Sequence, residues 1–296
     1  MPRLPFTRRS LLASAALATL RPAPLLALSQ VTTVAAIRER TVALPDGSIY
    51  LREADGGGPA VLLAHPVTGS AHVFDAQLRA LSSAGYRAIA WSRRGHRGSS
   101  PAAPDAALAQ NDLHQLTRAL ALVPFHLVGT AAGAGIALGY AISRPQELLS
   151  LTLACSASNI DDPALNAASR ALMPKGFDEL PAHIRELGPE FRAANPQGTQ
   201  AWRELEEFSR PSAGPLGPPP KPQITPSDLA ALAVPALWIA GEADLFAPPA
   251  LMRRVAEMAP GARFATIPRA GHSAYWEDPD AFNAIVLDFL ARTTNA

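Results

Sequence analysis

The sequence contains one cysteine, Cys155, among its 296 residues. A single thiol cannot form an internal disulfide, and it argues against a metal site built on thiolates. An excess of charge of one sign is also missing, because the formal net charge is +1 and no basic stripe runs through the sequence. We therefore expect no nucleic-acid partner.

A long uninterrupted apolar run is missing from the N-terminal region, because Arg21 separates the apolar segments 11–20 and 22–28. A membrane-spanning helix is therefore not expected there. Arg8 and Arg9 precede these segments and Ala27-Leu28-Ser29 follows them, an order that resembles a twin-arginine export signal over residues 1–29. This signal predicts a periplasmic or secreted protein without stable membrane insertion, and the alternative is a disordered N-terminal arm.

The remaining sequence alternates between patterns typical of strands and of helices. Hydrophobic residues make up 48% of the chain and charged residues 17%, as in ordinary globular proteins. Apolar and β-branched segments predict strands over 30–44, 49–53, 60–64, 85–91, 149–154, 236–240 and 263–267. Helical patterns follow over 105–122, 136–143, 249–258 and 278–292. This alternation predicts an α/β fold with a doubly wound, mostly parallel sheet of about eight strands.

The alternation stops between Ser156 and about Thr225. Helical patterns there cover 165–172, 177–187 and 200–208, and the proline-rich run Pro211–Pro222 is typical of an extended linker. We therefore expect a core of residues 30–155 and 226–296, with residues 156–225 as an inserted helical unit.

The segment Phe125–Gly135 carries the most informative pattern. A buried strand begins at Phe125, ends in small residues and leads into the helix that starts at Ile136. Gly129-x-Ala131-x-Gly133 matches the nucleophile elbow G-x-S-x-G, in which glycines permit a strained turn and close packing of helix on strand. A methyl group at Ala131 stands where that motif has the serine hydroxyl.

Four motifs in order make the chain resemble the α/β-hydrolase-fold family over residues 35–155 and 230–293, with the insert in the place of the family's cap domain. They are the oxyanion-loop-like segment 63–69, the arginine–glycine turn 93–99, the elbow 129–133, and the pair Gly241–Asp244 with Ala270–Ser273.

The resemblance implies site residues for this chain. Ala131 takes the nucleophile position, and Asp244 and His272 take the places of the catalytic acid and base. A carboxylate bound to one imidazole nitrogen fixes the tautomer, so the other nitrogen can accept a proton. The backbone N–H groups of Ala132 and Val67 are expected to form the oxyanion hole, which does not depend on side-chain identity.

Several further residues have two interpretations each. His65, Arg94 and His96 are expected mainly to brace loops, and His65, Thr130 and Trp276 are candidates for lining the pocket. Thr130, Cys155 and Ser156 are weaker candidates for replacing the missing nucleophile.

Three functional hypotheses remain open on the sequence. The first is an enzyme that cleaves an ester, lactone or carbon–carbon bond, or abstracts a proton, in a small, partly apolar carbonyl compound, with His272 as base and no covalent step. Hydroxynitrile lyases and cofactor-free dioxygenases of the family use the histidine in this way. The second is a non-catalytic binder of small molecules, and the third is an engineered inactive form of a serine hydrolase. No cofactor and no metal are expected, and the oligomeric state is left open.

Overall fold

The computed structural model of the chain describes residues 36–102, 108–157, 160–209 and 224–294. All of these residues belong to one compact unit. The expected export signal and the proline-rich run lie outside the described residues, so both stay predictions. No helix within the described ranges is long and apolar enough to cross a membrane.

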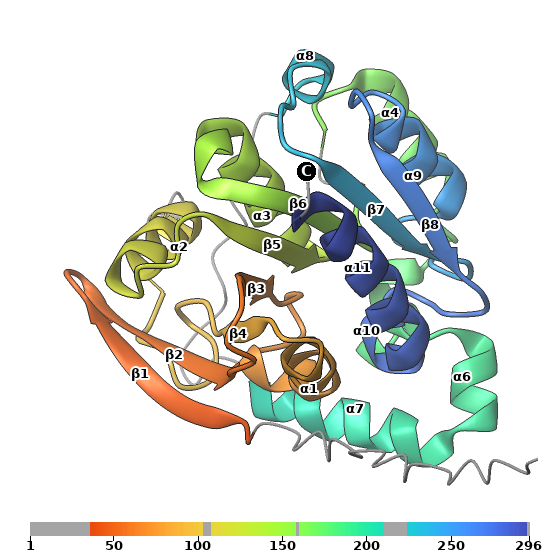
Figure 1. Cartoon of the computed structure of the whole chain (residues 1–296). Helices are drawn as coiled ribbons and strands as arrows, with labels where there is room; N and C mark the ends of the chain where they lie inside the picture. The colour runs from red at the N-terminus through yellow and green to blue at the C-terminus, as the bar shows by residue number, and fades with distance from the viewer. Residues whose placement is uncertain (1–35, 103–107, 158–159, 210–223, 295–296) are drawn as a thin grey trace, which may run out of the picture. The chain divides into compact units, whose positions relative to one another are not determined.

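One sheet of eight strands organises the fold, in the order β1-β2-β4-β3-β5-β6-β7-β8 (Figure 1). Its strands are β1 (Arg38–Leu44), β2 (Gly47–Ala54), β3 (Ala60–Ala64), β4 (Arg87–Trp91), β5 (Phe125–Thr130), β6 (Leu148–Ala154), β7 (Ala236–Gly241) and β8 (Arg263–Ile267). The pairs β1–β2 and β2–β4 are antiparallel, and every other pair is parallel. The predicted mostly parallel sheet of about eight strands is confirmed.

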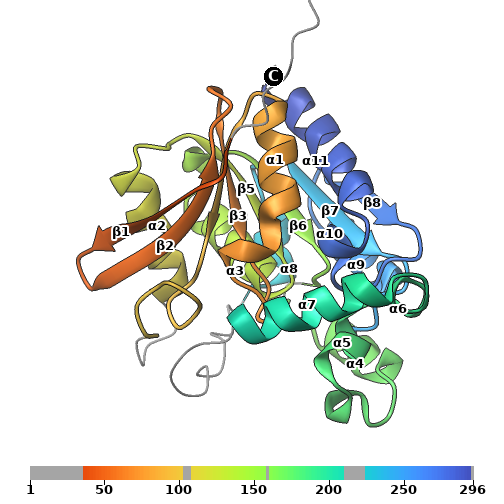
Figure 2. The same ribbon diagram turned by 90° about the horizontal axis from the view of Figure 1, so that it is seen from below.

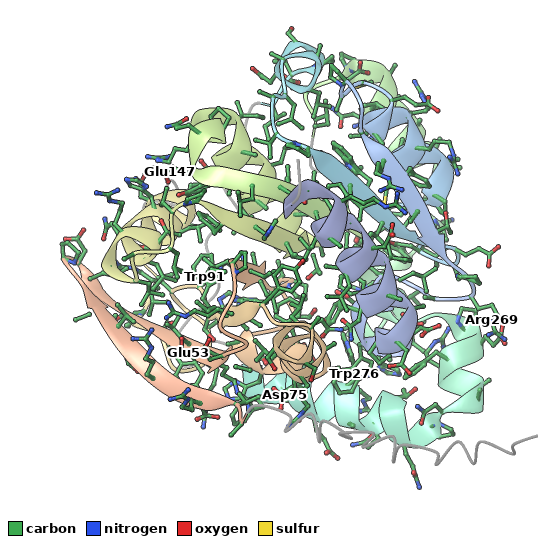
Figure 3. All side chains as sticks on the ribbon, viewed as in Figure 1. Glu53, Asp75, Trp91, Glu147, Arg269 and Trp276 are labelled. Atoms are coloured by element: carbon green, nitrogen blue, oxygen red, sulfur yellow. The ribbon has the colours of Figure 1, made fainter. Side chains whose placement is uncertain are left out.

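Helices cover both faces of the sheet, as Figures 1 and 2 show. Helices α1 (Asp75–Ser83) and α11 (Pro279–Thr294) lie on one face, and α2 (Leu108–Ala119), α3 (Ala132–Ser143) and α9 (Pro249–Ala256) lie on the other. Each face has its own apolar cluster. Trp91, labelled in Figure 3, and Trp238 are fully buried in the cluster on the α2–α3–α9 side. The doubly wound arrangement therefore buries the central strands from both sides, whereas most of β1 is exposed.

The segment between β6 and β7 forms the helical insert. Its described helices are α4 (Pro163–Leu172), α5 (Ala182–Glu186), α6 (Pro189–Ala194) and α7 (Pro196–Ser209), and α8 (Pro226–Ala230) follows before β7. Ile160 and Ile224 form a parallel bridge, and the N–H of Asp161 donates to the carbonyl of Ile224 at 2.7 Å. The insert therefore leaves and rejoins the core at neighbouring points.

Two helix boundaries differ from the sequence analysis. The expected helix 177–187 is a 3₁₀ turn, Phe177–Glu179, followed by α5, because Pro181 has no N–H to donate and Leu180 before it is extended. Helix α3 begins at Ala132 rather than Ile136, directly after the elbow. The expected helix 278–292 is confirmed as α11, which begins at Pro279 and ends at Thr294, and α10 (Ala274–Glu277) is an additional short helix just before it.

Candidate active site

Asp244 and His272 form a buried hydrogen-bonded pair at the carboxyl edge of the sheet. Asp244 follows β7 and His272 follows β8, two adjacent parallel strands whose ends meet at one edge. The imidazole Nδ1 lies 2.9 Å from Oδ2 and 3.0 Å from Oδ1 of the carboxylate. The N–H groups of Phe246 and Ala247 donate to Oδ1 at 2.8 and 3.0 Å, so the carboxylate is held in place before any ligand arrives.

The charge of His272 depends on its carboxylate neighbours. Burial lowers the pKa of the imidazole, but the Asp244 carboxylate and its hydrogen bond outweigh burial and, with Glu186 and Glu277, raise the pKa of His272 to about 9. At neutral pH the ring is therefore an imidazolium. Asp244 binds Nδ1, which leaves Nε2 as the atom that can give or take a proton.

Ala131 lies in the sharp turn between β5 and α3. Its φ of 50° and ψ of −116° are strained for a residue with a Cβ, and α3 starts at the next residue. A Cβ built on Gly129 would overlap the backbone of Gly133 and Ala134, and one on Gly133 would overlap the carbonyl of Ala64. Both glycines are thus required by close packing, as expected for a strand–turn–helix elbow.

Two contacts bring Ala131 and His272 to the same edge of the sheet. The N–H of Ala131 donates to the carbonyl of Ala154 at 2.9 Å, and the thiol of the next residue, Cys155, lies 4.0 Å from the carbonyl of Gly271. Burial, and next the Asp244 carboxylate, raise the pKa of the Cys155 thiol well above its usual range. Cys155 is therefore a neutral thiol between the elbow and the histidine, a state unsuited to nucleophilic attack.

In the loop after β3, hydrogen bonds fix the orientation of the peptide bond between Pro66 and Val67. The carbonyl of Pro66 accepts from His65 Nδ1 at 2.7 Å, from Arg93 Nη2 at 3.0 Å and from the N–H of Gly69 at 3.2 Å. In a planar trans peptide the N–H points opposite to the C=O, so the N–H of Val67 faces away from Arg93. Among the described residues none accepts a hydrogen bond from the backbone N–H of Val67, and Val67 is 47% exposed.

The N–H of Ala132 is the second expected oxyanion donor. As the first residue of α3 it has no carbonyl one turn earlier in the helix to bind. The twelve residues of α3 add the positive end of a helix dipole at this point. Ala131 and Ala132 are both partly exposed, so a ligand can reach this N–H.

His65 and His96 hold the loop that carries Val67. His65 is fully buried, and its Nε2 accepts from the N–H of Arg93 at 3.0 Å. The Nε2 of His96 lies 3.3 Å from the carbonyl of Val67. Burial is the largest cause that lowers the pKa of each ring, well below its usual range for His65 and to about 4 for His96. Both rings are neutral and act on the backbone of the loop.

The two other pocket candidates, Thr130 and Trp276, differ in burial and in contacts. Thr130 is fully buried, and its hydroxyl has no partner among the described residues. Trp276 is partly exposed, and its indole N–H donates to the carbonyl of Gly198 on α7 at 3.3 Å. Trp276 therefore joins the helical insert, called the cap from here on, to the core.

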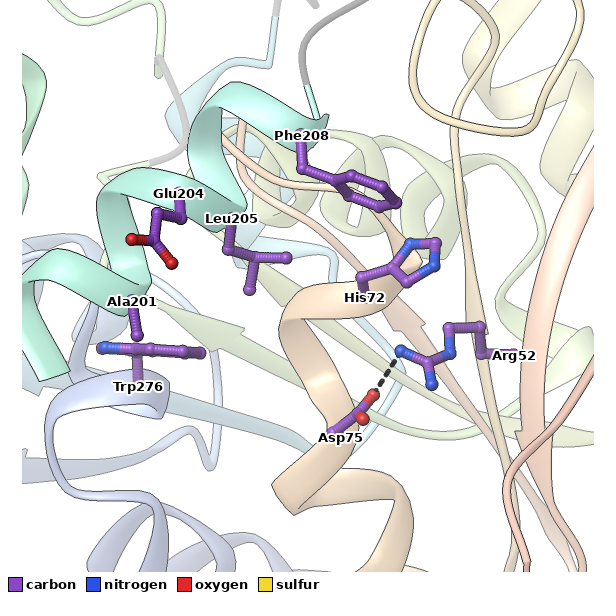
Figure 4. Close-up of a pocket in the computed structure, with 8 residues that line it drawn as sticks. All are labelled: Arg52, His72, Asp75, Ala201, Glu204, Leu205, Phe208 and Trp276. Atoms are coloured by element: carbon purple, nitrogen blue, oxygen red, sulfur yellow. Dashed lines mark ion pairs between the residues drawn. The ribbon is translucent and has the colours of Figure 1, made fainter.

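A shallow groove of about 540 Å³ lies beside α7, apart from the Asp244–His272 pair (Figure 4). Arg52, His72, Asp75 and Trp276 line it from the core, and Ala201, Glu204, Leu205 and Phe208 line it from α7. Arg52 and Asp75 form an ion pair at 2.6 Å in its floor. Trp276 is the one residue of this groove that the sequence analysis named as a candidate for the site.

The structure adds two carboxyl groups that the sequence motifs did not indicate, Glu186 on α5 and Glu277 on α10. Glu277 accepts from the N–H of Gly271 at 2.9 Å and of Gly188 at 2.8 Å, so it ties the histidine loop to the cap. Burial raises the pKa of Glu277 to about 7. No motif spacing marks either residue, because the contacts of Glu186 with Ser273 and of Glu277 with Gly188 join segments far apart in the sequence. Within the described ranges, no group of three His, Cys, Asp or Glu side chains is arranged to hold a metal ion.

The match to known families settles the classification. The model of the family described as "Alpha/beta hydrolase family" matches residues 61–285, most of the chain. The chain belongs to the alpha/beta hydrolase family. Its relative RutD from Variovorax paradoxus (strain S110), a protein named for carbamate hydrolysis, is 31% identical over 80% of this chain and 93% of RutD.

Two further proteins match the chain over most of its length. The 2-hydroxy-6-oxononadienedioate/2-hydroxy-6-oxononatrienedioate hydrolase from Paraburkholderia xenovorans (strain LB400) is 26% identical over 83% of this chain and 92% of its own length. The solved structure of a thermophilic esterase from Thermogutta terrifontis has a TM-score of 0.71 and 25% identity, over 88% of this chain and 99% of the esterase. The named relatives are hydrolases, and the match spans nearly their whole length.

Proposed function

We propose that this alpha/beta hydrolase family member is an acid–base enzyme for a small, partly apolar carbonyl compound, and that it works without a serine nucleophile. The observation that carries the proposal is the Asp244–His272 pair, 2.9 Å apart, at the sheet edge shared with the elbow at Ala131. The names of the relatives refer to a carbamate, an oxo-dioate and an ester, which supports a carbonyl substrate.

In the proposed mechanism His272 moves one proton at Nε2. With Nδ1–H donating to Asp244, neutral Nε2 takes a proton from a water or from an acidic C–H or O–H of the substrate, and Asp244 stabilises the imidazolium that results. The N–H groups of Val67 and Ala132 donate to the carbonyl oxygen as negative charge develops on it. When the proton comes from a water, the hydroxide adds to the carbonyl carbon, the bond from that carbon to the leaving atom breaks, and His272 gives its proton to the leaving atom. When the proton comes from the substrate, His272 returns it to the product, so in both routes the imidazole ends neutral.

A covalent route has no suitable group at the elbow. Ala131 occupies the nucleophile position in this proposal, and removal of the nucleophile from a working triad lowers turnover by about 10⁶-fold. The backbone donors and the base do not require that hydroxyl, and they support a residual acceleration of about 10³–10⁴-fold over water. The methyl group of Ala131 leaves space in which a water or substrate atom can approach Nε2.

Binding without turnover is the second candidate function. The observation that favours it is the charge of His272, whose pKa of about 9 keeps the ring protonated at neutral pH. An imidazolium next to two backbone N–H donors is suited to hold a carbonyl or carboxylate oxygen without reacting with it. Turnover that depends on His272 separates this candidate from the enzyme.

The test compares the protein with its His272→Ala variant on a panel of nitrophenyl esters, lactones and β-diketones. The enzyme proposal expects turnover in the protein and a loss of at least about 100-fold in the variant, the typical contribution of a general base. Thermal shift of both proteins with the same panel measures binding separately, because a ligand of the folded state raises the melting temperature. Binding that raises the melting temperature with no turnover would replace the enzyme by the binder.

A further inference from the structure

Glu186 brings a buried carboxyl group from the cap to the two loops of the candidate site. It is the last residue of α5 and is 7% exposed. The hydroxyl of Thr68, on the loop after β3, donates to Oε1 at 3.4 Å, and the hydroxyl of Ser273 donates to Oε2 at 3.2 Å. The backbone carbonyl of Glu186 also accepts from the N–H of Ser273 at 3.0 Å. One residue of the cap thus contacts both the Val67 loop and the His272 loop.

The hydrogen bonds around Glu186 suit an ionised carboxylate. The indole N–H of Trp202, on α7, donates to Ser273 Oγ at 3.2 Å, which directs the Ser273 hydroxyl proton to Glu186. The Thr68 hydroxyl lies 3.4 Å from Oε1 and can donate to it, so each carboxyl oxygen has a hydroxyl within hydrogen-bond reach. A carboxylate can accept at both oxygens without conflict, whereas a protonated carboxyl must donate from one of them.

The charged and titratable groups around this pair are few. Asp244 and Glu277 act on His272 together with Glu186. Burial raises the pKa of Glu186, the charge of His272 lowers it and the charge of Asp244 raises it. Tyr275 packs nearby, and burial followed by the Glu186 charge raises the pKa of its phenol, which therefore stays neutral. Among these groups, the imidazolium of His272 is therefore the positive charge that offsets the negative charge of Glu186.

The geometry points to Glu186 as a positioning residue for His272: it is a second anionic support, supplied by the cap, that complements the one Asp244 supplies from the core. The role rests on the proposed function insofar as His272 moves the proton of the reaction. The hydrogen bonds to Thr68 and Ser273 hold the carboxylate in place, and its charge stabilises the imidazolium form. Withdrawal of α5 from the core would therefore shift the imidazole towards its neutral, proton-accepting form.

The decisive measurement is the NMR titration of the His272 imidazole in the full-length protein, in Glu186→Gln and in Glu190→Gln. Glu190 is the matched control, because it is an exposed glutamate of α6 that pairs with Arg269 at the surface. We expect Glu186→Gln to lower the pKa of His272 by about 1 or more, the effect of removing one nearby opposite charge, and Glu190→Gln to leave it unchanged. Equal titration curves for the two variants would overturn the inference.

Two more variants separate charge from structure. Ser273→Ala removes one hydrogen bond but keeps the Glu186 charge, so the pKa of His272 should move less than in Glu186→Gln. If Glu186→Gln does not fold, Glu186→Asp takes its place. The shorter side chain moves the charge away from His272, so the pKa of His272 should fall by a smaller amount than in Glu186→Gln. An unchanged pKa of His272 in Glu186→Asp would contradict the role. The titration needs no substrate, so a protein without turnover in which the pKa still falls would refute the proposed function and leave the role of Glu186 standing.

Discussion

The imidazole Nδ1 of His272 lies 2.9 Å from Oδ2 of Asp244, although 28 residues separate them in the sequence. The side chain of Asp244 is fully buried, and that of His272 is 9% exposed. The pair therefore faces outward only through the imidazole. This arrangement leaves Nε2 as the ring nitrogen that a ligand can reach, and in the proposed function the protonation of His272 controls the site.

The rate of a reaction that needs neutral His272 should rise with pH. With a pKa of about 9 only about one hundredth of the rings are neutral at pH 7, so kcat/KM should increase about tenfold per pH unit up to about pH 9 and then level off. Asp244→Asn removes the largest contribution that raises this pKa, so the midpoint should move to lower pH while the plateau falls. A rate that declines with pH through 9 would show instead that the imidazolium is the reactive form.

Restoring a hydroxyl at the elbow should create a serine-type activity. Ala131→Ser places Oγ in the turn with φ of 50°, and turnover of nitrophenyl esters is expected to rise at least about 100-fold, with covalent labelling by a fluorophosphonate at residue 131. Ala121→Ser is the matched control, since Ala121 also has a positive φ, 52°, but lies beyond the end of α2. Labelling of the unchanged protein at Thr130 or Ser156 would contradict the absence of a nucleophile, and no gain in Ala131→Ser would mean that Val67 and Ala132 do not form a working oxyanion hole.

The elbow should tolerate no side chain at Gly133. Gly133→Ala puts a Cβ against the backbone carbonyls of Ala64 and His65, so either the helix or the strand must move. We expect a loss of about 3 kcal/mol in the free energy of unfolding, or failure to fold. Gly135→Ala in the same helix meets no atom within 4 Å and should instead stabilise by up to about 1 kcal/mol, the difference in helix propensity. Urea denaturation of the two variants checks this, and equal effects would contradict the packing argument.

Glu277 should make stability fall as pH rises. Burial raises the pKa of Glu277 from 4.5 to about 7, so the folded protein holds this proton more tightly than the unfolded chain does. The stabilisation is complete below about pH 4.5 and is lost as pH rises through 7, by at most about 3 kcal/mol. His272 adds a loss in the same direction between its ordinary value of 6.5 and about 9.

The Glu277→Gln variant isolates the contribution of that carboxyl group. It should flatten the fall in the free energy of unfolding between pH 4.5 and 7, as measured by urea denaturation at a series of pH values. The fall towards pH 9 should become smaller but persist, because Glu277 is the last-named of the carboxylates that raise the pKa of His272 and Asp244 is the main one. Glu242→Gln is the control, because Glu242 also accepts a backbone N–H, that of Arg269, but does so at the exposed surface. Parallel curves for the protein and Glu277→Gln would refute this assignment.

Local patterns in the sequence determined the scaffold of this protein. The apolar run at 60–64 is β3 residue for residue, and the Gly129–Gly133 spacing gives the strained turn after β5, because strand burial and glycine packing act over a few neighbouring residues. The sequence order of Asp244 and His272 also placed both residues after adjacent parallel strands, since strand ends meet at one edge.

The tertiary structure alone decided the charges and contacts of the site. Glu186 approaches Ser273 across 87 positions, and Glu277 joins Gly188 across 89, so no short pattern indicated that the insert contacts the His272 loop through these two carboxyl groups. The pKa of about 9 for His272 is the balance of burial against the carboxylates around it, and a charge interaction depends on distance in space. The sequence therefore determined the framework and indicated His272 as the candidate base, and the tertiary structure determined the electrostatic environment that sets when its imidazole is neutral.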